Sequence, residues 1–158
     1  MTIRRADIPD CNEILRLLGQ IAAHHRKGRP DLMGNCRSKL DRTELAAILR
    51  DEQQPVFVAQ DGNGAVCGYA FCRVLDTKNH PVLNDRRALY IDDFCVDETR
   101  RHQGVGKLLF QRCEEEAVAR GCDDIELNVW EFNKNAIAFY QSCGMKTQRR
   151  QMEMKVKY

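Results

Sequence analysis

The sequence lacks a hydrophobic run long enough to cross a membrane. No stretch approaches the roughly 20 consecutive apolar residues that a transmembrane helix needs. The first residues, Met1-Thr2-Ile3-Arg4-Arg5, lead into mixed polar sequence and not into the apolar core of a signal peptide. We therefore expect a cytoplasmic protein.

An excess of charge of one sign is also missing. The 158 residues contain 25 Lys and Arg against 23 Asp and Glu, which gives a formal net charge of +2. The basic residues are spread along the chain. Charge therefore gives no reason to expect a nucleic acid or an anionic membrane as partner.

Cys-x-x-Cys pairs are absent, although the chain contains 8 cysteines. Several of these fall inside predicted strands or helices, where free cysteine is ordinarily buried and inert. We therefore expect reduced core residues and no metal site. A catalytic or metal-binding cysteine is the alternative, and Cys143 is its best candidate.

The residues that are present predict one α/β domain over 1–158, a length that allows a single core. Periodicity predicts strands at 2–6, 55–60, 65–75, 89–96, 124–130 and 152–157, and helices after Asp10, after Asp41, at 105–120 and at 134–142. The polar stretch 76–87 is predicted to be a loop. A strand–helix–strand unit built on 105–120 makes the sheet mixed, with helices on both faces.

Short polar signals mark several element ends. Asp7 or Asp10 can cap the first helix, and Asp41 with Glu44 resembles a capping box. Asp61-Gly62-Asn63-Gly64 favours a hairpin between the second and third strands.

The most informative motif joins a predicted strand to a predicted helix. Arg101-His102-Gln103-Gly104-Val105-Gly106-Lys107 follows the apolar run 90–96 and opens the helical run 105–119. The first amides of a helix lack intrahelical acceptors, and the helix dipole adds positive charge there, so phosphate is a natural ligand. The two glycines allow a tight turn, and Arg100 adds to the basic surroundings. A plain surface turn is the alternative.

Two nucleotide motifs do not fit this stretch. A dinucleotide fingerprint, Gly-x-Gly-x-x-Gly, needs a third glycine where the chain has Leu109. The Walker pattern needs Ser or Thr after Gly106-Lys107, and Leu108 stands there. Dinucleotides and nucleoside triphosphates are therefore disfavoured as ligands.

The stretch 96–106 resembles the pyrophosphate loop of the Gcn5-related N-acetyltransferase (GNAT) family. That loop reads Arg/Gln-x-x-Gly-x-Gly/Ala after the fourth strand, and Arg101, Gly104 and Gly106 match it. A second stretch, 127–145, is similar to the family's later strand–helix segment. Two separated motifs in the right order are much more specific than one.

Two positions depart from the family's loop. Glu98 stands where the family often has proline, and His102 stands where a glycine is common. Neither side chain removes a backbone N–H donor. The resemblance covers nearly the whole chain, although the first half matches only in pattern.

The resemblance implies a mostly antiparallel sheet of about six to seven strands, splayed between strands 4 and 5. It implies acetyl-CoA as co-substrate, with the pantetheine arm along the fourth strand and the pyrophosphate at the loop. The residues that it assigns to the cofactor are Phe94, Cys95, Val96, Arg101, His102, Gln103, Gly104, Val105, Gly106, Lys107 and Asn133.

Tyr140 is implied to be the general acid that protonates the departing thiolate. It lies seven residues after Asn133, two helical turns on, so both side chains lie on nearly the same face of the helix that Asn133 can cap. The alternative is that Phe139 and Tyr140 are an aromatic core pair. Trp130 and Phe132 are expected to pack in the core.

The acceptor needs help to lose a proton, since an amine of pKa near 10.4 is neutral only about once in 2,500 molecules at pH 7. Asp92 and Asp93 are the candidates for the base. Successive strand residues point oppositely, so at least one should face the cleft. The run 90–94 also looks like the corresponding strand of the family's diamine acetyltransferases, where an acidic pair lines the acceptor site. An acidic pair bound to backbone or to arginines is the alternative.

The sequence thus predicts an acetyl-CoA-dependent N-acetyltransferase that passes the acetyl group directly to a primary amine. A small polyamine-like or aminoglycoside-like acceptor is favoured, and a homodimer is compatible with the family. Acetylation of a protein N-terminus or lysine, or a non-catalytic acyl-CoA-binding module, are the alternatives. His24, His25 and His80 are weaker candidates for the edge of the acceptor cleft.

Overall fold

The computed structural model describes residues 1–35 and 38–156 and divides the chain into two compact units. The first unit, Met1–Asn128, holds the strands that the described residues form. The second unit, Val129–Tyr158, holds helix α4 (Lys134–Ser142). The stretch 101–107, called the glycine loop below, and the acidic pair Asp92 and Asp93 therefore belong to the first unit. Asn133 and Tyr140 belong to the second unit.

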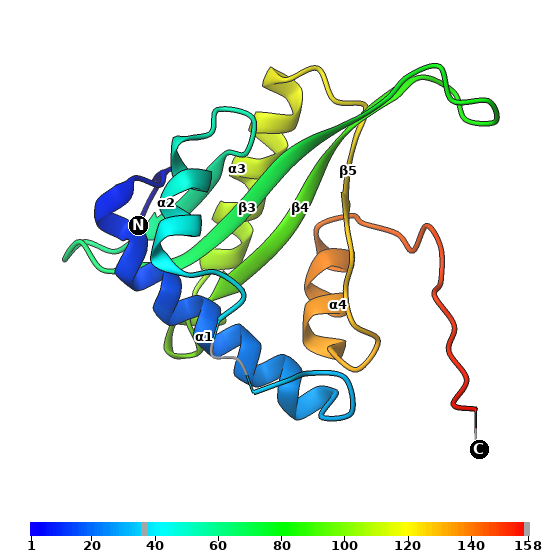
Figure 1. The fold of residues 1–158 in the computed structure, drawn as a ribbon. Coiled ribbons are helices and arrows are strands. Elements are labelled where there is room, and N and C mark those ends of the chain that lie inside the picture. The colour runs from blue at the N-terminus through cyan, green and yellow to red at the C-terminus, as the bar shows by residue number, and fades with distance from the viewer. Residues whose placement is uncertain (36–37, 157–158) are drawn as a thin grey trace. The chain divides into compact units, whose positions relative to one another are not determined.

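A five-stranded sheet in the order β1-β2-β3-β4-β5 forms the first unit (Figure 1). β1 (Thr2–Arg5), β2 (Val56–Gln60), β3 (Val66–Thr77) and β4 (Arg86–Val96) are antiparallel neighbours. β5 (Asp124–Leu127) pairs parallel with β4. β4 and β5 can be parallel because helix α3 (Val105–Ala119) connects them in the chain and carries it back along the sheet. The predicted mixed sheet is confirmed.

Helices cover both faces of this sheet (Figure 1). They are α1 (Cys11–Gly28), α2 (Arg42–Arg50) and α3 (Val105–Ala119), with short 3-10 turns at Ile8–Asp10 and Glu98–Arg100. Val56 and Val58 of β2 pack into one core cluster with residues of α1 and α2. Phe57 points the other way, where the Arg112 guanidinium of α3 lies 4.2 Å from its ring centroid. The alternation of a strand thus fixes which helix covers which face.

The predicted helix starts are partly confirmed. Asp41 and Glu44 form the capping box of α2, with both hydrogen bonds at 2.8 Å. Asp7 caps the first 3-10 turn and not α1 itself. The buried Asp10 carboxylate instead accepts two hydrogen bonds from the Arg4 guanidinium, at 2.7 and 2.8 Å, and so ties β1 to the start of α1.

The predicted count of about six to seven strands is wrong, because the described residues form five. The missing strand is the predicted closing one, in which Met152 and Met154 alternate with charged residues. Both methionines are 85% exposed, and the described residues 145–156 pair with no strand. An alternating sequence of apolar and charged residues forms a β-strand only where an adjacent strand pairs with it through backbone hydrogen bonds. Lys157 lies outside the described residues.

The predicted loop 76–87 is shorter than expected. Asp76 pairs with Arg87, and Thr77 with Arg86, so both strands continue into this polar stretch. The Arg87 guanidinium lies 2.9 Å from the Asp76 carboxylate across the ladder. Such cross-strand ion pairs allow a charged sequence to extend a hairpin that apolar periodicity misses.

The last strand of the sheet also differs from its prediction. β5 ends at Leu127 and not at residue 130, and its residues are exposed or partly buried. Arg86 of β4 pairs with Asp124 and Glu126 of β5. β5 therefore joins the sheet through ion pairs as well as through the ladder.

Gly68 of β3 allows α3 to approach the sheet closely. A Cβ atom at this position would lie 2.8 Å from the carbonyl oxygen of Cys95 and 3.0 Å from Leu109 Cδ1. We predict that Gly68→Ala lowers the free energy of unfolding by about 1–3 kcal/mol, because backbone or helix must shift. Denaturant unfolding measures this loss. Gly62→Ala is the control, since a Cβ there meets nothing within 4 Å. Equal losses in both variants would contradict this role of Gly68.

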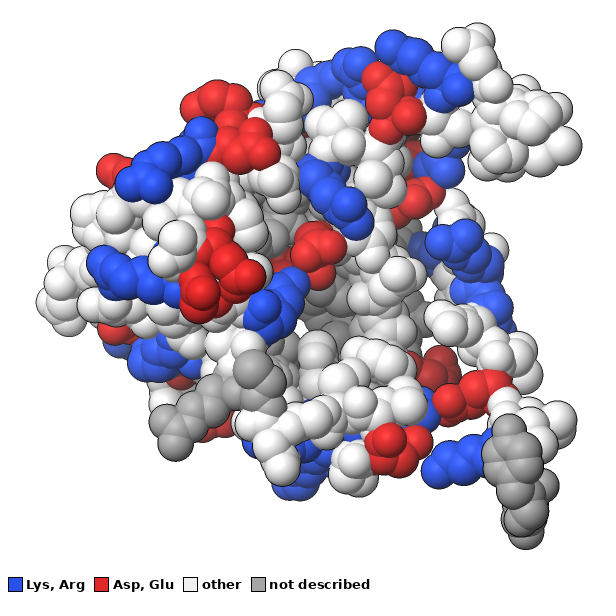
Figure 2. All heavy atoms as spheres, in the orientation of Figure 1, with Lys and Arg blue, Asp and Glu red and all other residues white. Residues whose placement is uncertain are grey.

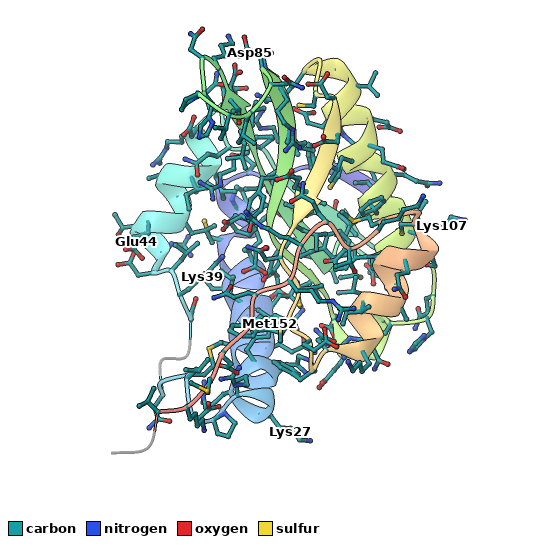
Figure 3. All side chains as sticks on the ribbon, turned by 90° about the vertical axis from the view of Figure 1, so that its right-hand side faces the viewer. Lys27, Lys39, Glu44, Asp85, Lys107 and Met152 are labelled. Atoms are coloured by element: carbon teal, nitrogen blue, oxygen red, sulfur yellow. The ribbon has the colours of Figure 1, made fainter. Side chains whose placement is uncertain are left out.

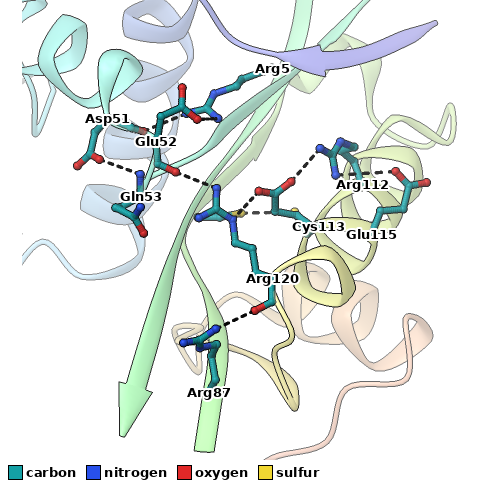
Figure 4. A network of polar contacts seen from close by, with 11 residues as sticks. Arg5, Asp51, Glu52, Gln53, Arg87, Arg112, Cys113, Glu115 and Arg120 are labelled. Carbon is teal, nitrogen blue, oxygen red and sulfur yellow. Dashed lines mark hydrogen bonds and ion pairs between the residues drawn. The ribbon is translucent and has the colours of Figure 1, made fainter.

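Arginines join α3 to the connection between α2 and β2 (Figure 4). Arg120 donates to the Glu116 carboxylate at 2.6 Å and to the backbone oxygen of Glu52 at 2.8 Å. Arg5 donates to the Glu52 carboxylate at 2.8 Å, and Arg87 donates to the Arg120 carbonyl at 3.1 Å. The network anchors the C-terminal end of α3 and so helps to fix the helix whose first turn forms the glycine loop.

The predicted burial of several cysteines is confirmed within the described part of the chain. Five of them are buried, namely Cys11, Cys67, Cys72, Cys95 and Cys113. Cys72 and Cys113 place their Sγ atoms 3.7 Å apart between β3 and α3. Cys143 is partly buried at the end of α4. Cys36 lies outside the described residues.

Charges of both signs are mixed on the surface. On the face that Figure 2 draws, Lys and Arg side chains lie among Asp and Glu side chains and form no single basic patch. Among the described residues, no helix combines the length and the apolar character that a membrane span requires.

Candidate functional site

The sheet opens between β4 and β5 in the second half of β4. The parallel ladder runs from Ala88↔Asp124 to Ile91↔Leu127 and extends no further. The segment Asp92–Val96 keeps β3 on one side, but among the described residues it has no strand partner on the other. Alternate peptide groups of this segment therefore face away from the ladder, as the predicted splay requires.

The glycine loop forms the first turn of α3, directly after this splayed segment. The first intrahelical hydrogen bond runs from the Leu108 N–H to the Gly104 oxygen at 3.1 Å. The amides of Val105, Gly106 and Lys107 have no acceptor within the described part of the chain. Gly104 adopts φ of 82°, a left-handed conformation that favours glycine. These amides and the helix dipole suit a diphosphate, so the residues fit the predicted ligand.

Asp97 holds the loop in place, a role that the sequence analysis missed. Its carboxylate accepts hydrogen bonds from the Thr99 N–H at 3.0 Å and the Thr99 hydroxyl at 2.9 Å. Arg16 of α1 donates to it at 2.6 Å. Burial raises the pKa of Asp97, but these hydrogen bonds outweigh burial and keep the pKa below its ordinary value. The Asp-x-Thr spacing after a strand is the signal that could have found it.

The basic residues of the loop are not equivalent. Arg100 pairs with Asp61 of the β2–β3 hairpin at 2.8 Å, so it braces the loop. The Arg101 Nε donates to the Val96 carbonyl at 3.3 Å, and Lys107 is exposed. The Gln103 side chain folds back to the Thr99 carbonyl at 3.2 Å. Arg101 and Lys107 are thus the better placed of the predicted cations.

His102 carries a backbone conformation that glycine adopts more easily. Its φ is 61°, in the left-handed region where a side chain is strained by about 1–2 kcal/mol. Glycine is common at this position in the family loop that the stretch 96–106 resembles, and the left-handed conformation gives a physical reason.

We predict that His102→Gly raises the free energy of unfolding by up to about 1 kcal/mol, because the relieved strain exceeds the extra entropy of glycine in the unfolded chain. Denaturant unfolding is the measurement. His102→Ala is the matched control, since it removes the imidazole but keeps the Cβ, and we expect no gain from it. A gain in both variants would trace the effect to the imidazole and not to the backbone.

Asp92 and Asp93 lie at a bulge in β4. The ladder pairs Phe71 with Asp93 and Cys72 with Ile91, so Asp92 is an extra residue in the strand. Both carboxylates contact Lys39, whose Nζ lies 3.2 Å from Asp92 Oδ2 and 2.9 Å from Asp93 Oδ2. The expected opposite orientation is therefore wrong for this pair, because the bulge interrupts the alternation.

The two carboxylates differ in burial and partners. The Asp93 side chain is 12% exposed and accepts a hydrogen bond from the Tyr69 hydroxyl at 3.1 Å. The Asp92 side chain is 45% exposed and lies 3.7 Å from the Arg73 guanidinium. The alternative that the acidic pair is bound to arginines therefore applies in part to Asp92, which has Arg73 nearby. Asp93 is the more enclosed and more firmly oriented of the two.

Lys39 is the residue of this cluster that no sequence pattern indicates. It lies on the connection between α1 and α2, and its Nζ is 5.9 Å from the Phe71 ring centroid. Burial lowers the pKa of Lys39, but the charges and hydrogen bonds of Asp93 and Asp92 outweigh burial and leave the pKa above its ordinary value. The side chain is therefore a stable ammonium at neutral pH.

The histidines are placed differently from one another. Burial lowers the pKa of His25; the Asp93 charge opposes this shift, whereas His24 and Lys39 add to it. His25 is therefore within electrostatic reach of the acidic pair. The His80 Nδ1 accepts a hydrogen bond from the Val82 N–H at 3.2 Å within the β3–β4 hairpin. That hairpin joins the other end of β4, so His80 belongs to a turn and not to the acidic pair.

Cys95 has its side chain turned into the core. Its Sγ lies 3.8 Å from the Leu17 carbonyl of α1, and burial raises the pKa of the thiol to about 12. The thiolate is therefore scarce at neutral pH, and this thiol is a poor nucleophile. What Cys95 offers a ligand is its backbone, which is the role the resemblance gave it.

Helix α4 in the second unit spans the residues predicted for it. The Asn133 side chain accepts a hydrogen bond from the Ala136 N–H at 3.2 Å and caps the helix, as predicted. Tyr140 lies two turns further on, with its ring centroid 5.2 Å from that of Phe139. Trp130 and Phe132 stack on each other at 6.2 Å between centroids. The helix thus presents both residues that the resemblance singles out.

Comparison with known proteins gives a family match across most of the chain. Residues 21–145 match the model of the family described as Acetyltransferase (GNAT) family. A crystal structure of a mutant of the BH1408 protein from Bacillus halodurans has 35% sequence identity and a TM-score of 0.96, and the match covers 99% of this chain and 100% of that one.

Two curated relatives carry named activities. Thialysine N-epsilon-acetyltransferase of Bos taurus is 33% identical over 152 residues, which are 90% of this chain and 82% of that protein. L-ornithine N5-acetyltransferase of Arabidopsis thaliana is 37% identical over 71 residues, 45% of this chain and 31% of that protein. The chain spans between 20% and 47% of the length of several curated relatives, so their matches concern only part of each protein.

Proposed function

The chain belongs to the GNAT family of acetyltransferases, and from this membership we propose that it transfers an acetyl group from acetyl-CoA to a primary amine. The observation that carries the proposal is the splayed end of β4, which joins an acidic pair to a loop of unpaired amides within one unit. The loop amides suit the anionic acetyl-CoA, and the acidic pair suits a cationic amine acceptor. A small polyamine-like or aminoglycoside-like acceptor is favoured.

The donor side uses mainly backbone groups. The amides from Gln103 to Lys107 hold the pyrophosphate, with Arg101 and Lys107 as exposed cations beside them. The outward-facing peptide groups of Phe94, Cys95 and Val96 match the amides of a pantetheine arm. Asn133 is a further cofactor residue by the resemblance. Because most of these donors are backbone groups, substitutions of the loop side chains affect binding less than changes in loop conformation.

The acceptor side uses the acidic pair. Asp93 accepts a proton from the acceptor ammonium, directly or through water, and the Tyr69 hydroxyl keeps the carboxylate oriented. Asp92 adds negative charge that favours a cationic acceptor. The amine nitrogen then forms a bond to the acetyl carbon while the carbon–sulfur bond breaks, and Tyr140 gives its proton to the thiolate. No acyl-enzyme is formed.

The relatives support an amine acceptor without fixing its identity. Their names refer to thialysine and ornithine, both of which carry a primary amine on a flexible chain. A pair of carboxylates suits such ammonium groups.

Release of coenzyme A thiol in the presence of acetyl-CoA tests the proposal. The acceptor panel contains diamines, polyamines, aminoglycosides, amino acids and lysine-bearing peptides. We expect amine-dependent thiol release that is strongest with the small cationic amines. Acetyl-CoA binding without transfer to any of these amines would contradict an enzyme and favour a binding module. Transfer to the peptides alone would contradict the small-molecule acceptor.

A further inference from the structure

Lys39 places an ammonium group between the two carboxylates of the proposed acceptor site. We propose that Lys39 is a specificity-determining residue, whose ammonium occupies the position that the acceptor ammonium takes and must be displaced by it. The inference rests on the proposed function and extends it, since it names the internal competitor of the acceptor.

The geometry is that of a bound ammonium ligand. The Lys39 Nζ lies within 3.2 Å of Asp92 and 2.9 Å of Asp93, and it faces the Phe71 ring at 5.9 Å from the centroid. Two carboxylates and an aromatic face are groups that recognise alkylammonium ions. A flexible amine bound here would meet the same three partners.

The Lys39 side chain can move away from the two carboxylates without breaking a helix or a strand. It belongs to the connection between α1 and α2, and helix or strand hydrogen bonds do not hold it. Its side chain is 45% exposed, and such partly exposed ion pairs are individually weak. The lysine can therefore move into solvent without unfolding either helix.

Exchange of one ammonium for another conserves the charge of the site. Asp92 also has Arg73 at 3.7 Å, but Asp93 has no second cation among its described ion pairs. Asp93 therefore has a cationic partner both before and after the acceptor binds only if the acceptor ammonium directly replaces the Lys39 ammonium. A neutral or anionic acceptor would not displace Lys39 from the carboxylates. Lys39 therefore makes the site selective for cationic amines.

Lys39→Met tests the competition, because it removes the charge and keeps most of the side-chain length. Lys27→Met is the matched control, since Lys27 is an exposed lysine near the end of α1, away from Lys39 (Figure 3). Loss of a competitor held by two weak ion pairs should lower the KM for a diamine acceptor by about 3- to 30-fold. The KM for acetyl-CoA should not change in either variant.

Lys39→Arg is the conservative variant, and it should keep the KM for the amine close to the wild-type value. A merely structural lysine would behave differently, because its loss would raise the amine KM or alter both KM values together. An amine KM that is unchanged or raised in Lys39→Met would overturn the proposal. Thermal unfolding checks that each variant is folded, and Lys39→Gln replaces the methionine variant if that one fails to fold.

Calorimetric binding of 1,4-diaminobutane separates this inference from the proposed function, because no acetyl transfer is needed. Tighter binding to Lys39→Met than to the wild type would support the competition even if thiol release is not found with any amine. Equal, weaker or undetectable binding to Lys39→Met would overturn it even if the wild type is an active acetyltransferase.

Discussion

Tyr140→Phe is expected to lower kcat by about 10- to 1,000-fold, with little change in the affinity for acetyl-CoA. The phenol is assigned to protonate the departing thiolate, and phenylalanine keeps the ring but cannot donate a proton. The loss should therefore appear in turnover and not in binding. Steady-state thiol release gives kcat, and calorimetry gives the dissociation constant.

Tyr90→Phe is the matched control for this variant. Tyr90 lies on β4, and its hydroxyl accepts a hydrogen bond from the Asn128 amide at 2.9 Å, with no proton transfer assigned to it. We expect kcat within about 2-fold of the wild type for this variant, since only a surface hydrogen bond is lost. Wild-type turnover by Tyr140→Phe would remove Tyr140 from the mechanism.

Asp93→Asn is expected to lower kcat/KM for the amine by about 100- to 10,000-fold at pH 7, the range for loss of a general base. Asparagine can still accept the Tyr69 hydrogen bond, so the bulge should keep its shape. Asp92→Asn is the comparison variant. Its decrease in kcat/KM should be at least about 10-fold smaller, because Asp92 is more exposed and its proposed role is only to supply negative charge.

The pH dependence gives this prediction a second measurement. The neutral fraction of an amine with pKa near 10.4 rises about tenfold per pH unit below that value. The need for a base therefore shrinks as pH rises, and the deficit of Asp93→Asn should narrow between pH 7 and pH 10. A deficit that is constant across this range, or an equal loss in Asp92→Asn, would contradict Asp93 as the base.

The parts of the fold that the sequence predicts well are those that depend on neighbouring residues. The capping box of Asp41 and Glu44 and the helix after Asn133 rest on interactions within one helical turn. The glycine loop likewise depends on the strand before it and the helix after it. Gly104 has the left-handed φ of a tight turn, and among residues 1–35 and 38–156 no backbone acceptor faces the first amides of α3.

The features that the sequence does not reveal depend on distant partners. The bulge at Asp92 is an irregularity in the pairing of β4 with β3, and that pairing joins residues about twenty positions apart. Lys39 meets the acidic pair across more than fifty positions of the chain. The alternating residues after 150 read as a strand, but pairing needs a neighbour that periodicity cannot supply.

Calorimetric titration of the wild-type protein with coenzyme A and with pantetheine tests the central claim most directly. Pantetheine lacks the diphosphate that the amides between Gln103 and Lys107 are proposed to hold. We predict that coenzyme A binds at least about 100-fold more tightly than pantetheine, as expected for several charge-assisted hydrogen bonds. Equal affinities, or no binding of coenzyme A, would contradict a diphosphate site at the start of α3.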